Sequence, residues 1–565
     1  RFNTQDCLEL CLDGRHLQSG SGVASFMYSK KLRNQNNNYF DSFARNAKWN
    51  IAEVAHIQKG NKRYYEWKIF LGEELVVEKT IGLDFQVFDK DSDGSFSFIS
   101  WGKGGQKFMN PGSLGDVILV SGNEKMGIIS GHVGWDKKID TKLPKDIRFI
   151  DTGNSKVWFE AALDSLGNYT ARVPAGHYEV RITDTYFQQG DSVFAITSIN
   201  PVSVSLRELG KSKAPDLILS NALAPDLIPD KGILTDFTSA SAGVVDHFIE
   251  TYQKYYGIPG VSLALIKDGK MVYHKTYGVR NTLTGQKVDD NTLFEAASVT
   301  KPVFAYTVQR LAERGVIDLD KPLYQYLPYP DIEHDERYKL ITAKHVLTHR
   351  TGFPNWRYMN ADGKLNIMFT PGTKYNYSGE GFEYLKMVVE KITGKKIAQV
   401  LQEEVIEPMG LWHTFFARND SLRRMVAEGH FGNLPNYDEL PESPGMAWSM
   451  HTEAKIFTKF MLWLLEERGL SADTYERMFS KQSEFNFDPG EEKWKDKVYM
   501  GMSLEIRETP LGKVFGHSGN NGDFRCVFEV NKDAKTGYVI FTNSSEANPL
   551  LRAIRQFMLD GKEKP

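Results

Sequence analysis

The chain has 565 residues, of which 41% are hydrophobic and 25% are charged. These proportions are ordinary for globular proteins, so they exclude wholesale disorder and favour several domains. Its 69 basic and 72 acidic side chains give a formal net charge of −3, which offers no attraction for nucleic acid or an anionic membrane surface. Three cysteines exclude a disulfide scaffold. The sequence also lacks the run of about 18 apolar residues that a membrane-spanning helix needs.

The first 215 residues have the pattern of β-structure. In residues 1–122, short alternating runs such as YYEWKIFLG (64–72) and LDFQVFD (83–89) are separated by Gly, Asn and Asp clusters. Residues 123–215 contain further such runs, including DIRFID, NYTARV and HYEVRITD, with SLGN and VPAGH as turns. Residues 216–235 are rich in Pro, Asp and Ala, which predicts a linker with one short pairing strand.

From residue 236 to residue 565 helical and strand patterns mix. An amphipathic helix is predicted at 244–256, followed by a hairpin at 261–278 with DG as its turn. Another helix is predicted at 381–395, and strands then return before a closing helix at 548–561. Strands at both ends with helices between them predict one α+β domain, in which terminal helices pack on an antiparallel sheet.

The pair Ser298 and Lys301, in the motif SVTK, is the main chemical feature of this domain. A three-residue offset on a helix places two side chains on one face. A serine hydroxyl needs an adjacent base to become a nucleophile, and a lysine can serve once burial lowers its pKa. Pro302 is tolerated only in the first turn of a helix, so we expect Ser298 at a helix start, where backbone N–H groups can stabilise an oxyanion.

The same spacing occurs a second time, at Ser100 and Lys103. This copy follows a predicted strand and enters a Gly-rich turn, where the spacing gives no shared helical face. The motif alone therefore does not identify the nucleophile, and a chance match is the alternative for either copy.

Several segments in a fixed order resemble the family of class C β-lactamases, penicillin-binding proteins and related serine esterases and D-aminopeptidases. They are GIPGVSLALIKDGKMVYHKTYG, LFEAASVTKPVFA, VLTHRTGFPN, PGTKYNYSGEGFEYL, EPMGLWHTFF and FGHSGNNGDF, and they cover about residues 240–560. The resemblance implies a β-lactamase/transpeptidase-like fold, with an antiparallel sheet flanked by helices and an all-helical subdomain. It also implies Ser298 as the nucleophile and Lys301 as its base.

The family's Tyr-x-Asn element corresponds to Tyr377-Ser378-Gly379. The resemblance implies that Tyr377 shuttles a proton between Ser298, Lys301 and the leaving group; a buried packing tyrosine is the alternative. Gly379 stands where the family has an Asn that binds a substrate amide, which puts recognition of β-lactams and peptides in doubt. Glu380 could supply another polar contact to the substrate, or it is a solvated loop carboxylate.

The family's Lys-Thr-Gly element corresponds to His517-Ser518-Gly519. The resemblance implies that this strand lines the acyl pocket and that the backbone N–H of Asn520 forms the oxyanion hole together with that of Ser298. His517 replaces a permanent cation by a mostly neutral group, which weakens attraction for a substrate carboxylate and is more typical of esterases and D-aminopeptidases. We expect His517 to belong to the catalytic group and to orient the network of Ser298, Lys301 and Tyr377; a strand histidine bonded only to backbone is the alternative. Trp356, Tyr358 and Trp448 follow pocket-lining elements of the family, although a lone aromatic is more often core.

The amino-terminal segments resemble accessory modules. Residues 1–122 resemble family-nine carbohydrate-binding modules, which are β-sandwiches that bind sugar ends between aromatic side chains, and Trp101 is the recognisable aromatic. Residues 123–215 resemble transthyretin-like sandwiches found beside carboxypeptidases. Asp89, Asp91 and Asp93 imitate a calcium loop, but Ser100 stands where its closing Glu belongs, so an acidic turn is the favoured interpretation and a looser calcium site the alternative.

Together these patterns predict a multidomain protein: a carbohydrate-binding-like sandwich (1–122), a transthyretin-like sandwich (123–215), a linker (216–235) and a serine hydrolase (236–565). We expect it to hydrolyse a small-acyl or sugar-linked ester through an acyl-enzyme, without a cofactor. A D-amino-acid peptidase or weak β-lactamase is the first alternative, and an inactive, carbohydrate-binding hydrolase fold is the second. Such modules suit an exported bacterial protein, periplasmic or extracellular, that contacts polysaccharide; no leader is visible in the sequence.

Overall fold

The structure is a computed structural model. Before residue 126 it describes only eight strands. From 126 to 562 it describes all residues except 138–142, 145, 154–157, 183–185, 190–191, 201, 224–225, 358–359, 361–363, 437–439, 486–497 and 510–511. The chain forms two compact units, the first comprising residues 1–184, 196–222 and 361–363, and the second residues 185–195, 223–360 and 364–565.

The amino-terminal strands of the first unit form an antiparallel sheet in the order β3-β2-β1-β6-β7, with β8 paired to β6 and a separate hairpin β4–β5. The predicted run at 83–89 lies in β6, and residues 64–69 of the run at 64–72 lie in β5, the rest of that run being outside the described residues. Trp101, Asp91 and Asp93, and the side chain of Asp89, lie outside the described residues, so the sugar and calcium sites stay predictions. The strands are β1 Cys7–Asp13, β2 Ala24–Ser29, β3 Tyr39–Asp41, β4 Ala52–Lys59, β5 Lys62–Ile69, β6 Thr80–Lys90, β7 Phe96–Ser100 and β8 Gly115–Ile118.

The rest of the first unit contains two sheets that share one apolar core. One has the order β11-β10-β13-β16, and in the other β9 pairs with β12, β17 and β18. The ring of Phe149 on β10 makes an edge-to-face contact with that of Tyr169 on β12, with centroids 5.6 Å apart. Side chains of the two sheets therefore pack against each other. The strands are β9 Gly127–Trp135, β10 Asp146–Asp151, β11 Trp158–Ala162, β12 Asn168–Val173, β13 Gly176–Ile182, β16 Val202–Leu206, β17 Lys211–Lys213 and β18 Leu217–Leu223. The strand β18 is the pairing strand expected within 216–235.

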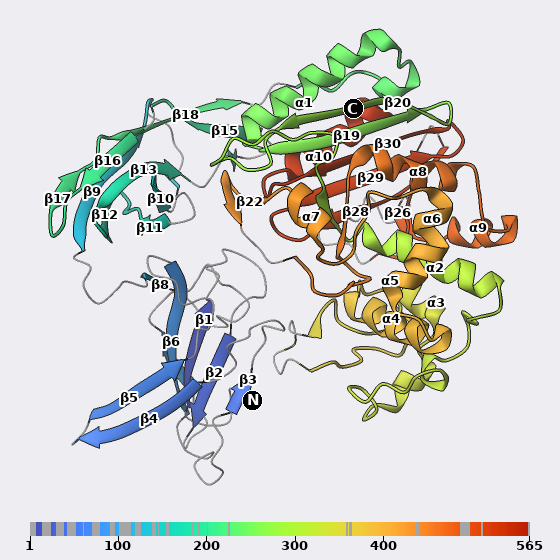
Figure 1. Cartoon of the computed structure of the whole chain (residues 1–565), viewed down its shortest axis with the longest axis horizontal. Coiled ribbons are helices and arrows are strands. Elements are labelled where there is room, and N and C mark those ends of the chain that lie inside the picture. The colour runs from blue at the N-terminus through green and yellow to red at the C-terminus, as the bar shows by residue number, and fades with distance from the viewer. Residues whose placement is uncertain are drawn as a thin grey trace. The chain divides into compact units, whose positions relative to one another are not determined.

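The second unit is organised by an antiparallel sheet in the order β20-β19-β30-β29-β28-β27-β26-β25 (Figure 1). The predicted hairpin turns at Asp268 and Gly269, both left-handed with φ of 51° and 69°, which is the turn type that Asp-Gly favours. The strands are β19 Gly260–Lys267, β20 Lys270–Gly278, β25 Ser483–Glu484, β26 Val498–Met500, β27 Glu505–Thr509, β28 Gly512–Asn520, β29 Arg525–Asn531 and β30 Thr536–Thr542.

Helices cover both faces of this sheet (Figure 1). On one face, α1, α10 and the π-helical turn Gln556–Asp560 that follows α10 build a core, in which Phe248 stacks on Phe557 with ring centroids 3.9 Å apart. On the other face, α2 and α8 pack in a larger core that extends into the remaining helices. Along β19, Leu263 and Leu265 enter the first core and Ala264 and Ile266 the second, as the two-residue period of a strand requires. The α+β architecture predicted for 236–565 is confirmed.

The remaining elements of the second unit complete that larger core and its rim. The hairpin of β14 Tyr186–Gln189 and β15 Ser192–Ser198 begins in this unit. Short strand pairs are β21 Phe294–Ala297 with β24 Met450–Thr452, and β22 Gly429–Phe431 with β23 Leu434–Asn436. The helices are α1 Ala242–Tyr256, α2 Thr300–Glu313, α3 Ala343–Leu347, α4 Gly379–Thr393, α5 Ile397–Leu401, α6 Glu407–Met409, α7 Asp420–Met425, α8 Ala454–Leu465, α9 Ala472–Met478 and α10 Asn548–Arg555.

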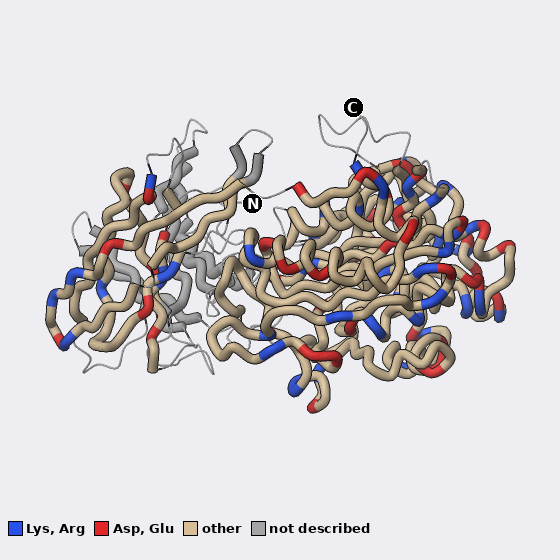
Figure 2. Tube along the Cα trace, turned by 90° about the horizontal axis from the view of Figure 1, so that it is seen from above, with Lys and Arg blue, Asp and Glu red and all other residues tan. Residues whose placement is uncertain are grey.

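Basic and acidic residues interleave along the trace of this unit (Figure 2), in keeping with the near-neutral net charge. None of the helices in the described part of the chain combines the length and the apolar character needed to cross a membrane.

Candidate active site

Ser298 lies in the turn between β21 and α2, half-buried, as the sequence predicted. The turn is tight because the Val299 N–H donates to the Ala296 carbonyl and the Lys301 N–H donates to the Ser298 carbonyl, each at 3.0 Å. Ala297, just before the serine, has φ of 45°, a left-handed conformation that costs free energy for a residue other than glycine. The surrounding structure therefore holds the nucleophile in a strained strand-to-helix turn.

Lys301 meets the requirements of a general base for Ser298. Its Nζ lies 3.1 Å from the Ser298 Oγ and donates to the Ala447 carbonyl at 2.7 Å. The side chain is 1% exposed, and burial lowers its pKa to about 7, although the nearby Glu383 raises it. Among the described residues no ion pair involves Lys301. A substantial fraction of this lysine is thus neutral near pH 7 and can accept a proton.

Tyr377 completes this group immediately before α4. The Lys301 Nζ lies 4.7 Å from the centre of its ring, and a hydrogen bond links its hydroxyl to Ser298. Burial raises the pKa of Tyr377 above its ordinary value, more than that hydrogen bond lowers it. The phenol therefore keeps its proton at neutral pH and can give it to a leaving group.

Strand β28 passes beside the segment that leads to Ser298. A Cβ at Gly519 would lie 2.5 Å from the Ala296 carbonyl oxygen and 2.4 Å from the Cys526 Sγ, so only glycine allows this approach. After the strand, the Asn521 amide donates to the Glu295 carboxylate and, at 3.4 Å, to the Trp448 carbonyl.

These contacts place the backbone of Gly519 and the residue that follows it at the same site as Ser298. Asn520 and Ser518 are exposed at this edge. An oxyanion hole formed by the Ser298 and Asn520 N–H groups stays a prediction.

His517 is neutral and buried at the back of this site. Burial, with smaller effects of Lys301, lowers its pKa to about 3, and the side chain is only 2% exposed. Its Nδ1 lies 2.6 Å from the Ser518 carbonyl, its Nε2 has no hydrogen-bond partner among the described residues, and its ring centre is 6.2 Å from that of Tyr377. His517 thus cannot serve as a cation for a substrate carboxylate, as the sequence indicated.

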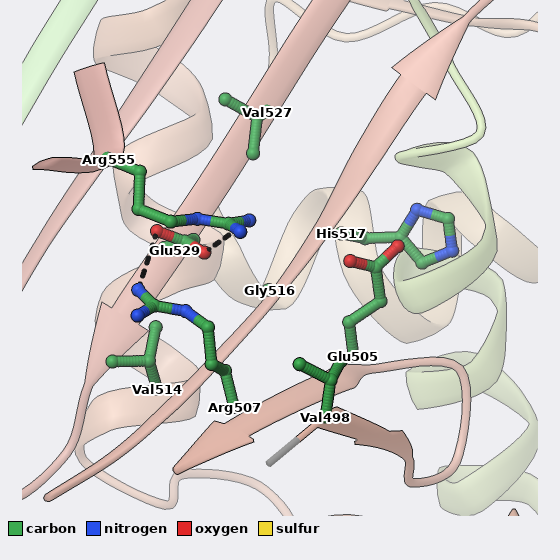
Figure 3. A pocket seen from close by; sticks show the side chains of 9 residues that line it. All are labelled: Val498, Glu505, Arg507, Val514, Gly516, His517, Val527, Glu529 and Arg555. Atoms are coloured by element: carbon green, nitrogen blue, oxygen red, sulfur yellow. Dashed lines mark ion pairs between the residues drawn. The ribbon is translucent and has the colours of Figure 1, made fainter. Parts of the chain in front are cut away.

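Behind His517 a cavity of about 30 Å³ contains charged side chains that neutralise one another (Figure 3). Arg555 pairs with Glu529 at 2.8 Å, and Arg507 pairs with Asp560 at 2.8 Å. The volume suits about two water molecules, not a substrate. Figure 3 shows Glu505 pointing to the side of His517, and this carboxylate hydrogen-bonds Ser518.

Gly379 is required because Trp356 covers it. A Cβ at position 379 would lie 2.6 Å from two carbons of the indole. The loop that carries Trp356 is held on both sides: Asn355 accepts hydrogen bonds from the Gly379 N–H through its backbone at 2.9 Å and its side chain at 3.0 Å, and Arg357 binds Glu380. An indole thus occupies the space into which the family's Asn side chain would project.

Glu380 is not the solvated loop carboxylate that the sequence favoured. It is 1% exposed, and its two oxygens accept hydrogen bonds from the Arg357 N–H at 3.0 Å and from its guanidinium at 2.9 to 3.1 Å. A carboxylate is stable at such depth only when it is paired. Its role is to anchor the Trp356 loop, which adjacency to Tyr377 in the sequence could not reveal.

Trp448 lies half-buried next to Ala447, the residue whose carbonyl binds Lys301, and its indole rests on Gly445, where a Cβ would be 2.4 Å from the Trp448 Nε1. The side chain also packs against the larger core, so its role as a pocket wall stays a prediction. Tyr358 lies outside the described residues. Within the described part of the chain, His, Cys, Asp and Glu side chains form no group of three or more that could hold a metal ion.

The sequence reasoning missed three contributors to the site. The Ala447 carbonyl fixes Lys301, Glu383 accepts from the Ala447 N–H at 3.3 Å, and His349 stacks on Tyr377 with ring centroids 4.2 Å apart. A backbone carbonyl leaves no signal in a sequence. His349 belongs to the segment VLTHRTGFPN, so its place between other family elements could have marked it.

Comparison with known proteins matches residues 245–562, more than half of the chain, to the β-lactamase family model. "Protein flp" of Staphylococcus aureus (strain MW2) is 23% identical over 338 residues, which cover 56% of this chain and 66% of that protein. "Esterase EstB" of Burkholderia gladioli is 29% identical over 210 residues, which cover 32% of this chain and 51% of that protein. The chain thus spans roughly half to two thirds of the length of these relatives.

A solved structure, the octameric penicillin-binding protein homologue from Pyrococcus abyssi, aligns with 55% of this chain and 76% of its own at 22% identity and a TM-score of 0.49. The family model covers more than half of the chain, so the chain belongs to the β-lactamase family of penicillin-binding-protein-like serine hydrolases.

Proposed function

We propose that this protein hydrolyses carboxylic esters through an acyl-enzyme on Ser298. The observation that carries the proposal is the buried Lys301, whose Nζ lies 3.1 Å from the Ser298 Oγ and whose pKa is lowered to about 7. An exposed lysine would be almost fully protonated at neutral pH and could not accept the hydroxyl proton.

The reaction proceeds in two steps. Lys301 takes the Ser298 proton as the Oγ attacks the ester carbonyl, and the N–H groups of Ser298 and Asn520 stabilise the oxyanion. Tyr377, held protonated by burial, donates a proton to the departing alkoxide. The protonated Lys301 then returns a proton to Tyr377. Water attacks the acyl-enzyme carbonyl and gives a proton to Lys301; the bond between the acyl carbon and the Ser298 Oγ breaks, the Oγ takes that proton back, and the carboxylic acid is released.

The ester preference rests on Trp356 and Gly379. The indole stands 2.6 Å from the point where a side chain at 379 would begin, so this wall offers an aromatic surface instead of an amide. A site without a partner for the substrate amide leaves that group desolvated and unpaired, which disfavours amide substrates. The likeness to an esterase at 29% identity supports the same preference.

Labelling by a fluorophosphonate, read by intact mass, tests the nucleophile. We expect one adduct on the wild type and none on Ser298→Ala, whereas Ser100→Ala, which alters the other Ser-x-x-Lys copy, keeps the adduct. An unlabelled wild type, or a label that survives Ser298→Ala, would contradict the proposal. Comparing short acyl esters, nitrocefin and a D-alanyl amide then tests the preference, and faster turnover of nitrocefin or the amide would reverse it.

For residues 1–122 we propose binding of polysaccharide ends, which would bring an exported hydrolase to its substrate. Support comes from the module resemblance and Trp101. A glycan array probed with the full chain and with Trp101→Ala tests it: we expect binding that the substitution removes, and an array with no binding would contradict it.

A further inference from the structure

His349 holds Tyr377 through contacts on both sides of it in the chain. The Asn376 N–H donates to the His349 carbonyl at 2.8 Å, and the Ser378 N–H donates to the His349 Nδ1 at 3.0 Å. Between these two anchors the imidazole lies against the Tyr377 ring, with centroids 4.2 Å apart and planes inclined by 25°. One residue thus fixes the backbone before and after Tyr377 and one face of its ring.

The conformation of His349 is costly on its own. Its φ is 54°, a left-handed value that a non-glycine residue adopts at a cost of about 1–3 kcal/mol, and its side chain is fully buried. Its Nε2 has no hydrogen-bond partner among the described residues. Such an arrangement persists when surrounding contacts enforce it, and strained buried residues concentrate at functional sites.

The contacts also fix the protonation of the ring. Since Nδ1 accepts a backbone N–H, the proton of the neutral imidazole is on Nε2. Burial, together with Lys301 and His517 nearby, lowers the pKa of His349 well below its ordinary value, so the ring adds no positive charge beside Lys301. A flat, neutral hydrogen-bond acceptor is what the position demands.

We propose that His349 is a positioning residue that holds the Tyr377 hydroxyl where it can protonate the leaving group. The inference rests on the proposed ester hydrolysis. It predicts a defect that depends on the leaving group: an alkyl alkoxide needs the proton of Tyr377, whereas p-nitrophenolate leaves without one.

The test compares His349→Phe, which keeps a flat ring but not the acceptor, with His349→Asn, which keeps an acceptor but not the ring. We expect either change to lower kcat for an ethyl ester by about 10- to 100-fold, which is part of the roughly 10²- to 10⁴-fold that general acid catalysis contributes. For the p-nitrophenyl ester we expect a loss below about 3-fold. In a Tyr377→Phe background the ethyl-ester effect should vanish, because the residue through which His349 acts is gone.

His345, one helical turn earlier on α3, is the matched control. Its Nδ1 lies 3.1 Å from the Leu340 carbonyl, and its ring does not stack on Tyr377 as that of His349 does, so the same two substitutions there should leave the ratio of ethyl to p-nitrophenyl ester turnover unchanged.

Labelling by a fluorophosphonate, with the melting temperature, separates the possible failures. An unlabelled wild type removes the proposed function and this inference with it. Labelled variants with equal losses on both esters, or losses additive with Tyr377→Phe, overturn the inference alone and leave the proposed function standing. Should His349→Phe fail to fold, His349→Asn decides by the same ratio.

Discussion

The two faces of the central sheet differ in how their basic side chains are paired. On the face of α10, Arg555 and Arg507 lie near Glu529, which binds the first at 2.8 Å, and the pair raises the pKa of Arg555. On the face of α2, Lys301 is buried without an ion pair among the described residues, and burial outweighs the effect of the nearby Glu383, so its pKa falls to about 7. A paired arginine becomes costly only when its carboxylate is removed, whereas a buried lysine without an ion pair costs free energy as it stands and becomes a reactive base.

Removing Lys301, the buried base without an ion pair, should have the largest effect on the acylation rate. We expect Lys301→Met to lower the rate of Ser298 acylation by about 10⁴-fold or more, as removal of one member of a catalytic unit does. Stopped-flow acylation by a p-nitrophenyl ester measures it. Retention of more than about a tenth of the rate would mean that another group takes the proton.

The same variant should be more stable than the wild type. The folded pKa of Lys301 lies below its unfolded value of 10.5, so its burial costs free energy that is fully present below pH 7 and is relieved as the pH rises toward 10.5. Each pKa unit corresponds to about 1.4 kcal/mol. Because the substitution also removes two hydrogen bonds of Lys301, we expect the free energy of unfolding to rise by roughly 1–3 kcal/mol. Urea unfolding at pH 6 and pH 9 measures it, and a gain larger at pH 9 would contradict the account.

On the face of α10, where the arginines are paired with a carboxylate, a substitution that removes the pairing should lower the stability. Glu529→Gln removes the carboxylate that Arg555 and Arg507 share, while Arg507 keeps Asp560 and the Arg555 side chain is 39% exposed, so we expect a loss of about 1–3 kcal/mol of stability with unchanged kcat for the folded fraction. The exposed pair Arg418–Glu442 is the control, because Glu442→Gln should cost at most about 1 kcal/mol. Urea unfolding and ester turnover measure both, and a kcat loss in Glu529→Gln with little change in stability would erase the distinction between the faces.

Substitutions at the aromatic wall should shift specificity by a smaller amount. Gly379→Asn alone collides with Trp356, while Trp356→Ala with Gly379→Asn has room for the amide. We expect the double variant to gain about 10- to 100-fold in kcat/KM for a D-alanyl amide relative to an apolar ester, more than the sum of the single changes. Additive effects would mean that the indole does not occupy the amide-binding space.

The sequence could predict those parts of the site that depend on local spacing and family order. Ser298 in a turn before a helix, Lys301 one turn on and the hairpin at Asp268-Gly269 follow from short-range chemistry. The order of family elements added Tyr377 and the strand of His517. Glu380 could not be placed, because its partner Arg357 lies 23 residues away and nothing local indicates that a loop folds back on it. The hydrogen bonds of His349 to Asn376 and Ser378 likewise arise only from tertiary structure.

The most direct test of the central claim is the pH dependence of Ser298 acylation by a p-nitrophenyl ester. A base with a pKa of about 7 is protonated and inactive in acid, so the rate should fall tenfold per pH unit below about pH 7 and level off above it. Lys301→Met should remove this titration. A wild-type rate that keeps rising toward pH 10, as an ordinary lysine with a pKa near 10.4 would require, would contradict the proposal that burial makes Lys301 the base.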